Sequence, residues 1–356
     1  MVPTNPVIGT GLHAIGGMSA ASCYTPFQKV KSWSWTSFWI VQALFAWFLV
    51  PLVIGMITVP DFFGVLRDSP SHILWGAFIL GGIYGFGGMS FGFSIRHIGY
   101  SLTYTISIGL SAVIGTLVPV IINGTMVEYF SRPGSNIVIL GMVLSIIGVG
   151  LTGWAGFRKE KDLVSLNGSA LNFNMKKGLI LAVIGGLLSA VFNISLEYGQ
   201  PIADLAAQRG AGNFQGNAKT IVSTAGCLTV NLVWFLILGF RTKTMKEFIP
   251  GRTVGTKRYV MNFLLSALAG TLWFMQFLFY GLGHVQMGNF QFISWVLHMS
   301  MLIFFSYIVG VIVKEWKKVS KPTYIILIVA LLTLVLSFII MTYGSVIGER
   351  ALNSAI

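Results

Sequence analysis

The sequence predicts an all-α, polytopic membrane protein with ten transmembrane helices in two inverted five-helix repeats. Three observations support this fold class. The 356 residues are 55% hydrophobic and only 9% charged, whereas a soluble domain carries about 25% charged residues. Ten apolar stretches are each long enough to cross a bilayer, which takes about 20 residues. The basic residues gather in alternate connections between these stretches, as is typical of membrane proteins.

The ten predicted spans follow one another with mostly short connections. They cover residues 7–25, 36–59, 72–94, 100–122, 136–156, 178–199, 219–240, 262–283, 290–313 and 322–344. The longer connections, 157–177, 200–218 and 241–261, are too short to hold a soluble domain. In the third span the Gly81-x-x-x-Gly85 and Gly88-x-x-x-Gly92 pairs predict close approach of a neighbouring helix, because small residues let backbones meet.

The distribution of basic residues predicts the orientation of the spans. Most of the 23 Lys and Arg residues lie in the odd-numbered connections, for example 24–35, 157–177 and 241–261. The exceptions are Arg67, Arg132, Arg209, Lys219 and Arg350. Because basic residues are retained on the cytoplasmic side, we expect both termini and the even-numbered connections outside the cell. The excess of basic residues behind the net charge of +13 is thus explained by membrane orientation, and we expect no nucleic-acid partner.

Weak internal similarity predicts two halves of opposite orientation, residues 1–165 and 166–356. Ile15-Gly-Gly-Met-Ser-Ala20 in the first span resembles Ile184-Gly-Gly-Leu-Leu-Ser-Ala190 in the sixth. Five predicted spans separate these runs, and an odd number of crossings inverts the second half. Inverted repeats are typical of secondary transporters, which bind their substrate near the midplane of the membrane.

Two stretches near the C-terminus carry polar and aromatic side chains at helical spacing. The first holds Trp273, Gln276, Phe277 and Tyr280, and the second holds Gln291, Ser294, Trp295 and His298. Residues so spaced share one helix face. Polar groups are costly in hydrocarbon, so we expect both faces to turn toward a cavity. Aromatic planes with amide, hydroxyl and imidazole groups suit a neutral polyol such as a sugar; the alternative is that they only join helices.

Other spans offer candidates at a similar depth in the outer half of the membrane. Asn193 and Glu197 lie in the sixth span, and His13 and Tyr24 share a stripe of the first. Glu197 is the one acidic residue placed well within a span, and an intramembrane carboxylate is a candidate proton carrier. His13 and His298 are also candidates, because imidazole titrates near neutral pH. The alternative is that Glu197 is hydrated at the external end and the histidines make ordinary polar contacts.

Five short runs along the chain carry a resemblance to a known family. They are His13-Ala-Ile-Gly16, Tyr24-Thr-Pro-Phe-Gln-Lys-Val-Lys-Ser-Trp-Ser-Trp35, Ile121-Ile-Asn-Gly124, Ile293-Ser-Trp-Val-Leu-His-Met299 and Val313-Lys-Glu-Trp316. With these runs the chain resembles the L-rhamnose–proton symporter family. The similarity extends through nearly the whole chain, and the Trp-Ser-Trp and Ile-Ser-Trp-x-Leu-His-Met runs are its most specific parts.

The resemblance implies a ten-helix bundle of the drug/metabolite transporter superfamily. It also implies uptake of L-rhamnose or a related 6-deoxyhexose with a proton by alternating access across the bacterial inner membrane. The candidate substrate-binding residues are then His13, Tyr24, Asn193, Trp273, Gln276, Phe277, Tyr280, Gln291, Trp295 and His298, with Glu197, His13 and His298 for proton coupling. Glu197 and Gln200 stand where the family pattern has Asn and Lys, which leaves the coupling ion and the exact sugar open.

The expected partners are a small sugar, a proton and membrane lipids, with sodium as the alternative ion and a monomer as the expected state. We expect no cofactor and no metal, because Cys23 and Cys227 lie in apolar runs and the sequence has no Cys/His cluster. Two alternatives stay open: an exporter or exchanger of another small polar metabolite, and a non-transporting sugar sensor. An enzyme would need a nucleophile–base pair or metal ligands, and the sequence shows neither.

Overall fold

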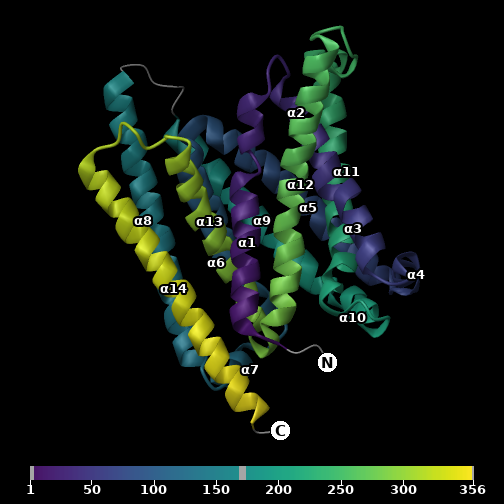
Figure 1. Cartoon of the computed structure of the whole chain (residues 1–356), viewed down its shortest axis with the longest axis vertical. Helices are drawn as coiled ribbons and strands as arrows, with labels where there is room; N and C mark the ends of the chain where they lie inside the picture. The colour runs from purple at the N-terminus through teal and green to yellow at the C-terminus, as the bar shows by residue number, and fades with distance from the viewer. Residues whose placement is uncertain (1–3, 168–173, 355–356) are drawn as a thin grey trace. The chain divides into compact units, whose positions relative to one another are not determined.

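The computed structural model describes residues 4–167 and 174–354 (Figure 1). Helix makes up 87% of the structure, and the described residues form no strand. The long helices are α1 (Pro6–Ser22), α2 (Trp35–Leu44), α3 (Val50–Thr58), α5 (Ser71–Ile98), α6 (Tyr100–Ile122), α8 (Ser135–Asn167), α9 (Met175–Tyr198), α11 (Gly216–Thr242), α12 (Thr256–Gln286), α13 (Ser294–Ile312) and α14 (Lys321–Asn353). The shorter elements are α4 (Phe62–Asp68), α7 (Met126–Ser131), α10 (Gln200–Gln208), η1 (Thr25–Lys29), η2 (Phe45–Leu49), η3 (Gly212–Phe214), η4 (Thr244–Phe248) and η5 (Gly288–Ile293).

Nine helical stretches of the described chain are long and apolar enough to cross a membrane. Each of them overlaps one predicted span, and α2 and α3 together form the second. Helix α1 coincides with the first predicted span, but it is only 17 residues long, at the lower limit for a spanning helix. The all-α polytopic class is therefore confirmed, while the count of ten spans and the inverted repeats stay predictions.

Contacts within the chain group its residues into two compact units. Unit 1 takes residues 1–18, 87–194 and 282–356, and unit 2 takes residues 19–86 and 195–281. Each unit draws on both halves of the sequence, so this grouping does not test the proposed division into residues 1–165 and 166–356. Helices α1, α5, α9 and α12 contribute residues to both units.

In unit 1, α14 packs along α8, and α6 packs against both α8 and α13 (Figure 1). Glycines make the first of these contacts close. A Cβ added to Gly141 of α8 would lie 2.5 Å from Cγ of Met341, and one added to Gly148 would lie 2.7 Å from Cδ2 of Leu334. Small residues therefore allow the two longest helices of the unit to meet along much of their length.

In unit 2, two glycines bring the backbones of α5 and α11 together. A Cβ on Gly81 would lie 1.9 Å from the carbonyl oxygen of Ser223, and a Cβ on Gly226 would lie 1.9 Å from that of Phe78. One turn further along α5, a Cβ added to Gly85 would lie 3.1 Å from the carbonyl oxygen of Cys227. The close approach predicted at Gly81-x-x-x-Gly85 is therefore present, whereas an added Cβ on Gly92 of the second predicted pair has no neighbour within 4 Å.

The second span is interrupted by a π-helical turn, η2, just before Pro51. Proline has no N–H, and its ring clashes with the carbonyl four residues earlier, here that of Trp47. The wide π turn over Phe45–Leu49 accommodates this clash without ending the span. Such turns often occur at functional sites. A Cβ added to Gly270 of α12 would lie only 2.3 Å from the carbonyl oxygen of Gln42. Helix α12 therefore packs directly against the second span at the start of the π turn.

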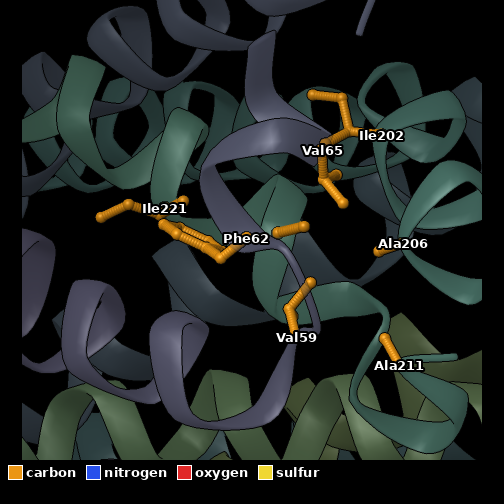
Figure 2. Packing of buried hydrophobic residues seen from close by; sticks show 8 residues of the cluster. Val59, Phe62, Val65, Ile202, Ala206, Ala211 and Ile221 are labelled. Carbon is orange, nitrogen blue, oxygen red and sulfur yellow. The ribbon is translucent and has the colours of Figure 1, made fainter. Parts of the chain in front are cut away.

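The end of unit 2 that holds α4 and α10 has its own apolar core. Its buried side chains are Val59, Phe62, Val65, Ile202, Ala206, Ala211, Ala218 and Ile221 (Figure 2). At the surface Arg209 reaches Asp61 at 2.7 Å and Asp68 at 2.5 Å. Hydrogen bonds from Arg67 and then Arg209 hold the pKa of the Asp68 carboxyl at about 2. These contacts join two connections that the orientation prediction places on the same side.

Replacing Gly81 by Ala is expected to destabilise unit 2. The new methyl group would meet the main chain of Ser223, so α5 and α11 must separate, at a cost of about 1–3 kcal/mol. The matched control is Gly92→Ala in the same helix, where an added Cβ has no neighbour within 4 Å and the higher helix propensity of Ala is slightly stabilising. Thermal unfolding of the purified protein in detergent checks this; equal melting temperatures for both variants would contradict it.

Candidate functional site

Unit 2 holds the predicted aromatic stripe of α12 in its interior. Trp273, Gln276, Phe277 and Tyr280 are all buried, in agreement with the predicted inward face. The Trp273 ring lies 4.8 Å from that of Phe277 and 5.4 Å from that of Trp47, measured between ring centroids. These separations are typical of attractive aromatic pairs. The stripe therefore continues onto the second span, through Trp47 on the π turn.

The ring contacts extend from Trp47 to Tyr24. Trp47 lies 6.0 Å from Trp39 at an interplanar angle of 76°, and Trp39 stacks on Tyr24 at 6.4 Å and 8°. The indole N–H of Trp39 is fixed by Asn231 Oδ1 at 3.0 Å. Tyr24, Trp39, Trp47, Trp273 and Phe277 thus form one aromatic chain, named so below. The structure joins three predicted site residues to two that the sequence analysis did not select.

Three buried polar atoms of unit 2 have no hydrogen-bond partner among the described residues: Nε1 of Trp33, Oε1 of Gln42 and Nε1 of Trp47. The last two belong to side chains of the second span that are 3% and 4% exposed. Buried polar groups are nearly always paired, so exceptions call for an explanation. An unpaired acceptor and an unpaired donor are what two hydroxyl groups of a sugar can satisfy. The sequence analysis missed both, although Gln42 is the one amide side chain in the span 36–59.

Glu197 lies half-buried in unit 2 beside a buried cation. The Lys219 side chain is 5% exposed, and its ammonium donates a hydrogen bond to Oε1 of Gln200. The charges of Glu197 and Asp204 both act on Lys219, and the charge of Glu197 also acts on the Tyr280 phenol. Lys219 lies in the first turn of α11, in agreement with the predicted span 219–240, of which it is the first residue. The candidate proton carrier is therefore electrostatically linked to the α12 stripe.

Unit 1 gathers the predicted histidines. His13 of α1 and His298 of α13 are fully buried, with ring centroids 5.7 Å apart in an edge-to-face arrangement. Gly283 makes room for the His13 ring, because a Cβ there would lie 2.9 Å from its Cε1 atom. His284, at 9% exposed, comes next along α12. Among the described residues no group of three His, Cys, Asp or Glu side chains could hold a metal ion.

Trp295 and Asn193 both bond to main-chain carbonyls of α6. The Trp295 indole donates to the Ser111 oxygen at 3.0 Å, and the Asn193 amide donates to the Gly115 oxygen at 2.8 Å. An added Cβ on Gly115 would lie 2.4 Å from Trp295 Nε1, so the indole needs a glycine there. These bonds hold α9, α6 and α13 together. These bonds favour the alternative interpretation, in which the polar side chains join helices, over the interpretation in which they donate hydrogen bonds to a substrate.

Three buried hydroxyl groups lie close to these residues along the chain. Oγ of Ser111, Oγ1 of Thr116 and Oγ of Ser294 have no hydrogen-bond partner among the described residues. Gln291 is half-buried in η5, the short segment that leads into α13. Unit 1 therefore offers unpaired hydroxyl groups near Trp295, in addition to its histidines.

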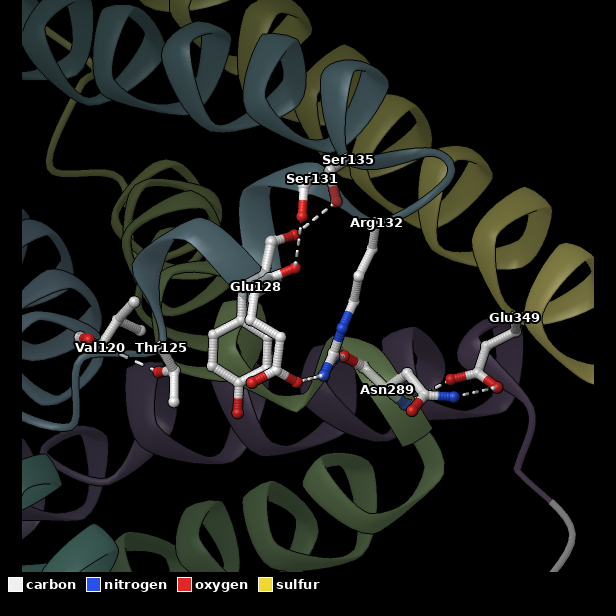
Figure 3. A network of polar contacts seen from close by, with 9 residues as sticks. Val120, Thr125, Glu128, Ser131, Arg132, Ser135, Asn289 and Glu349 are labelled. Carbon is white, nitrogen blue, oxygen red and sulfur yellow. Dashed lines mark hydrogen bonds and ion pairs between the residues drawn. The ribbon is translucent and has the colours of Figure 1, made fainter.

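A polar network fixes the segment that carries Gln291 (Figure 3). Arg132 donates hydrogen bonds to the Asn289 carbonyl and to Glu128. The buried carboxylate of Glu349 accepts from the Asn289 main-chain N–H and, at 3.3 Å, from its side-chain amide. Gly288 has a φ of +55°, which favours glycine. The network joins the connection before α8, the connection before α13 and the end of α14.

The predicted site residues thus fall into two groups. Unit 1 holds His13, Asn193, Gln291, Trp295 and His298, and unit 2 holds Tyr24, Glu197, Trp273, Gln276, Phe277 and Tyr280. Most members of each group are buried, and most make ring contacts, hydrogen bonds or electrostatic interactions with other residues of the same unit. That both groups serve one substrate stays a prediction.

Comparison with known proteins identifies the family. A family model described as L-rhamnose-proton symport protein matches residues 4–347. An L-rhamnose-proton symporter of Mannheimia succiniciproducens is 33% identical over 340 residues, covering 95% of this chain and 98% of the relative. One of Yersinia pestis is 32% identical over 342 residues, with the same coverage. No solved structure matches significantly. The chain belongs to the L-rhamnose–proton symport family, which is a family of transporters.

Proposed function

We propose that this protein imports L-rhamnose together with a proton, by alternating access across the bacterial inner membrane. The family match and the names of the relatives support this function. The observation that carries it within the structure is the aromatic chain of unit 2. This chain includes Trp47, whose buried N–H has no partner, and Trp47 lies in the same span as Gln42, whose buried side-chain oxygen has none. We further propose a monomer with both termini outside the cell, as the distribution of basic residues indicates.

The aromatic chain suits the mixed character of a 6-deoxyhexose. Such a sugar has an apolar ring face and a methyl group as well as hydroxyl groups, and aromatic rings provide large flat apolar surfaces. Trp47 Nε1 would donate to one sugar hydroxyl and Gln42 Oε1 would accept from another, with Gln276 adding further polar contacts. In unit 1 the unpaired hydroxyls and His298 are the corresponding candidates, while Trp295 and Asn193 position them.

Proton coupling is assigned to Glu197, which is half-buried near the end of α9, two residues before Gly199, where an added Cβ would lie 3.2 Å from Cβ of Lys219. When Glu197 is ionised it stabilises the buried ammonium of Lys219; when it is protonated that stabilisation is lost. Lys219 would then rearrange its hydrogen bond to Gln200. A proton can drive transport only if the two conformations differ in their affinity for it, and a change in the distance between Glu197 and Lys219 would supply such a difference. His13 and His298 are the further candidate carriers.

Radiolabelled L-rhamnose uptake into proteoliposomes tests the proposed function. An inside-alkaline pH gradient is expected to drive saturable accumulation above the external concentration, and a protonophore is expected to abolish it. A sodium gradient at equal pH on both sides is the matched comparison and should drive none. Absence of saturable uptake would end the rhamnose assignment, and accumulation driven by sodium alone would end the proton assignment.

Substitutions at the unpaired polar atoms test their role in binding. Gln42→Leu and Trp47→Phe each remove one polar group and keep most of the side-chain volume. Each is expected to raise KM for L-rhamnose about tenfold, the worth of one hydrogen bond. Gln42→Leu should leave the melting temperature unchanged or higher, because no bond within the protein is lost. Trp47→Phe should lower it, because the smaller ring leaves a cavity and weakens the ring contacts.

Asn193→Leu is the control for these two variants. It breaks the bond to Gly115 and should lower the melting temperature. If Gln42→Leu and Trp47→Phe leave KM unchanged, or if Gln42→Leu destabilises the protein as much as the control does, the assignment to sugar binding is wrong.

Glu197→Gln is expected to separate sugar movement from proton movement. Sugar exchange without a gradient should persist within a few-fold, because the binding groups remain, while accumulation driven by the pH gradient should disappear. Asp204→Asn is the matched control, since Asp204 also acts on Lys219 but is exposed, and it should remain coupled. Full pH-driven accumulation by Glu197→Gln would remove Glu197 from the coupling step.

A further inference from the structure

A basic cleft opens in unit 2, away from the aromatic stripe of α12. It has a volume of about 630 Å³. One wall comes from Lys29, the last residue of η1, and Lys31, which follows in the next connection. The other wall comes from the first turns of α12, with Thr256, Lys257, Arg258 and Asn262. The sequence analysis used these basic residues only to orient the spans. These basic residues belong to the predicted connections 24–35 and 241–261, which the distribution of basic residues places on the cytoplasmic side.

The charge of this cleft is not balanced by neighbouring carboxylates. None of the residues that line it is acidic. Within residues 4–167 and 174–354, Lys29, Lys31, Lys257 and Arg258 form no ion pair with a carboxylate. Glu247, which contacts the same connection, is bonded to the Ser34 N–H at 2.8 Å and the Ser34 hydroxyl at 3.0 Å. Four like charges held together without a counter-charge favour binding of an anion.

The cleft is built on fixed elements. Asn262, only 1% exposed, clamps the main chain of Lys31 in both directions: it donates to the Lys31 carbonyl at 2.9 Å and accepts from the Lys31 N–H at 3.3 Å. Next to this clamp Trp33 packs between Phe248 at 5.7 Å and Tyr259 at 5.6 Å. The connection that carries the two lysines is thus held against α12, which reduces the entropy lost when a ligand is bound.

The residues of the cleft match the chemistry of a phosphate group. Thr256 begins α12, and the first turn of a helix presents N–H groups without helical partners and a positive dipole end. The side chains of Lys29, Lys31, Lys257 and Arg258 add full positive charges. An arginine side chain can also donate two parallel hydrogen bonds to a phosphate group. The exposed Met261 side chain gives the cleft an apolar edge. Basic pockets on the cytoplasmic side of membrane helices are suited to acidic lipid headgroups.

We propose that this cleft binds a phosphate group, carried either by an acidic phospholipid or by a soluble phosphorylated metabolite. The site is separate from the proposed sugar contacts. Its test therefore measures melting temperature and does not depend on transport of rhamnose.

The experiment uses the purified full-length protein in detergent and compares three forms: the natural chain, Lys257→Gln with Arg258→Gln, and a matched control, Lys317→Gln with Lys318→Gln. The control removes two exposed basic residues predicted to lie on the same side but outside the cleft. One arm titrates phosphatidylglycerol against phosphatidylcholine, and the other titrates inorganic phosphate against chloride at equal ionic strength.

Phosphatidylglycerol, inorganic phosphate or both should raise the melting temperature of the natural chain and of the control. In the cleft variant the apparent affinity for that ligand should fall about 30-fold, as expected for two basic contacts. A fall in the lipid arm alone identifies a headgroup, and a fall in the phosphate arm identifies a soluble ligand. The proposal is overturned if the cleft variant and the control respond alike in both arms, or if neither ligand stabilises the natural chain.

Discussion

The structure depends on one constraint: a polar side chain inside a membrane bundle must find its partner within the protein, because lipid offers none. Most interior polar groups satisfy it by bonding a neighbouring helix. The Trp295 indole and the Asn193 amide use carbonyls of α6, and Ser145 of α8 bonds Ser300 of α13 at 2.6 Å. These bonds make the helices of each unit specific for one another, as the close glycine contacts do.

The exceptions to this constraint occur in both units, and they are most informative where two of them lie close together in the chain. In unit 2 Gln42 and Trp47 lie on either side of the start of a π turn, and Trp47 is part of the aromatic chain. The π turn is itself a consequence of Pro51, so a backbone irregularity and two unpaired polar atoms occur within ten residues. Irregular backbone at membrane depth is tolerated where it is buried in protein or lines a cavity. This coincidence supports a binding role better than either feature alone.

The sequence predicts the spans well because hydropathy alone sets them, and it predicts local faces because helical spacing does. Trp273 and Phe277 are in contact as their i, i+4 spacing indicates. Features that depend on distant parts of the chain were missed. Gln42 has no polar neighbour at helical spacing, and its significance appears only when its partners can be counted in three dimensions. Lys219 was used only to orient the spans, and its burial beside Gly199 and Gln200 depends on how α9 and α10 pack against α11.

For the same reason Asn193 and Trp295 were correctly expected to be buried, but their bonds to α6 could not be predicted. A side chain that faces inward can bind a substrate or a neighbouring helix, and only the tertiary structure distinguishes the two. Among the residues selected for sugar binding, Asn193 and Trp295 already donate to main-chain carbonyls, whereas Tyr24, Trp273 and Phe277 belong to the aromatic chain.

The central claim is that unpaired buried polar atoms next to aromatic rings mark the sugar site. An experimental structure with L-rhamnose bound tests it most directly. The account predicts sugar hydroxyl groups within hydrogen-bonding distance of Gln42 Oε1 and Trp47 Nε1, with a ring of the aromatic chain against the sugar. A sugar bound elsewhere, with these two atoms unchanged from the sugar-free protein, would contradict it.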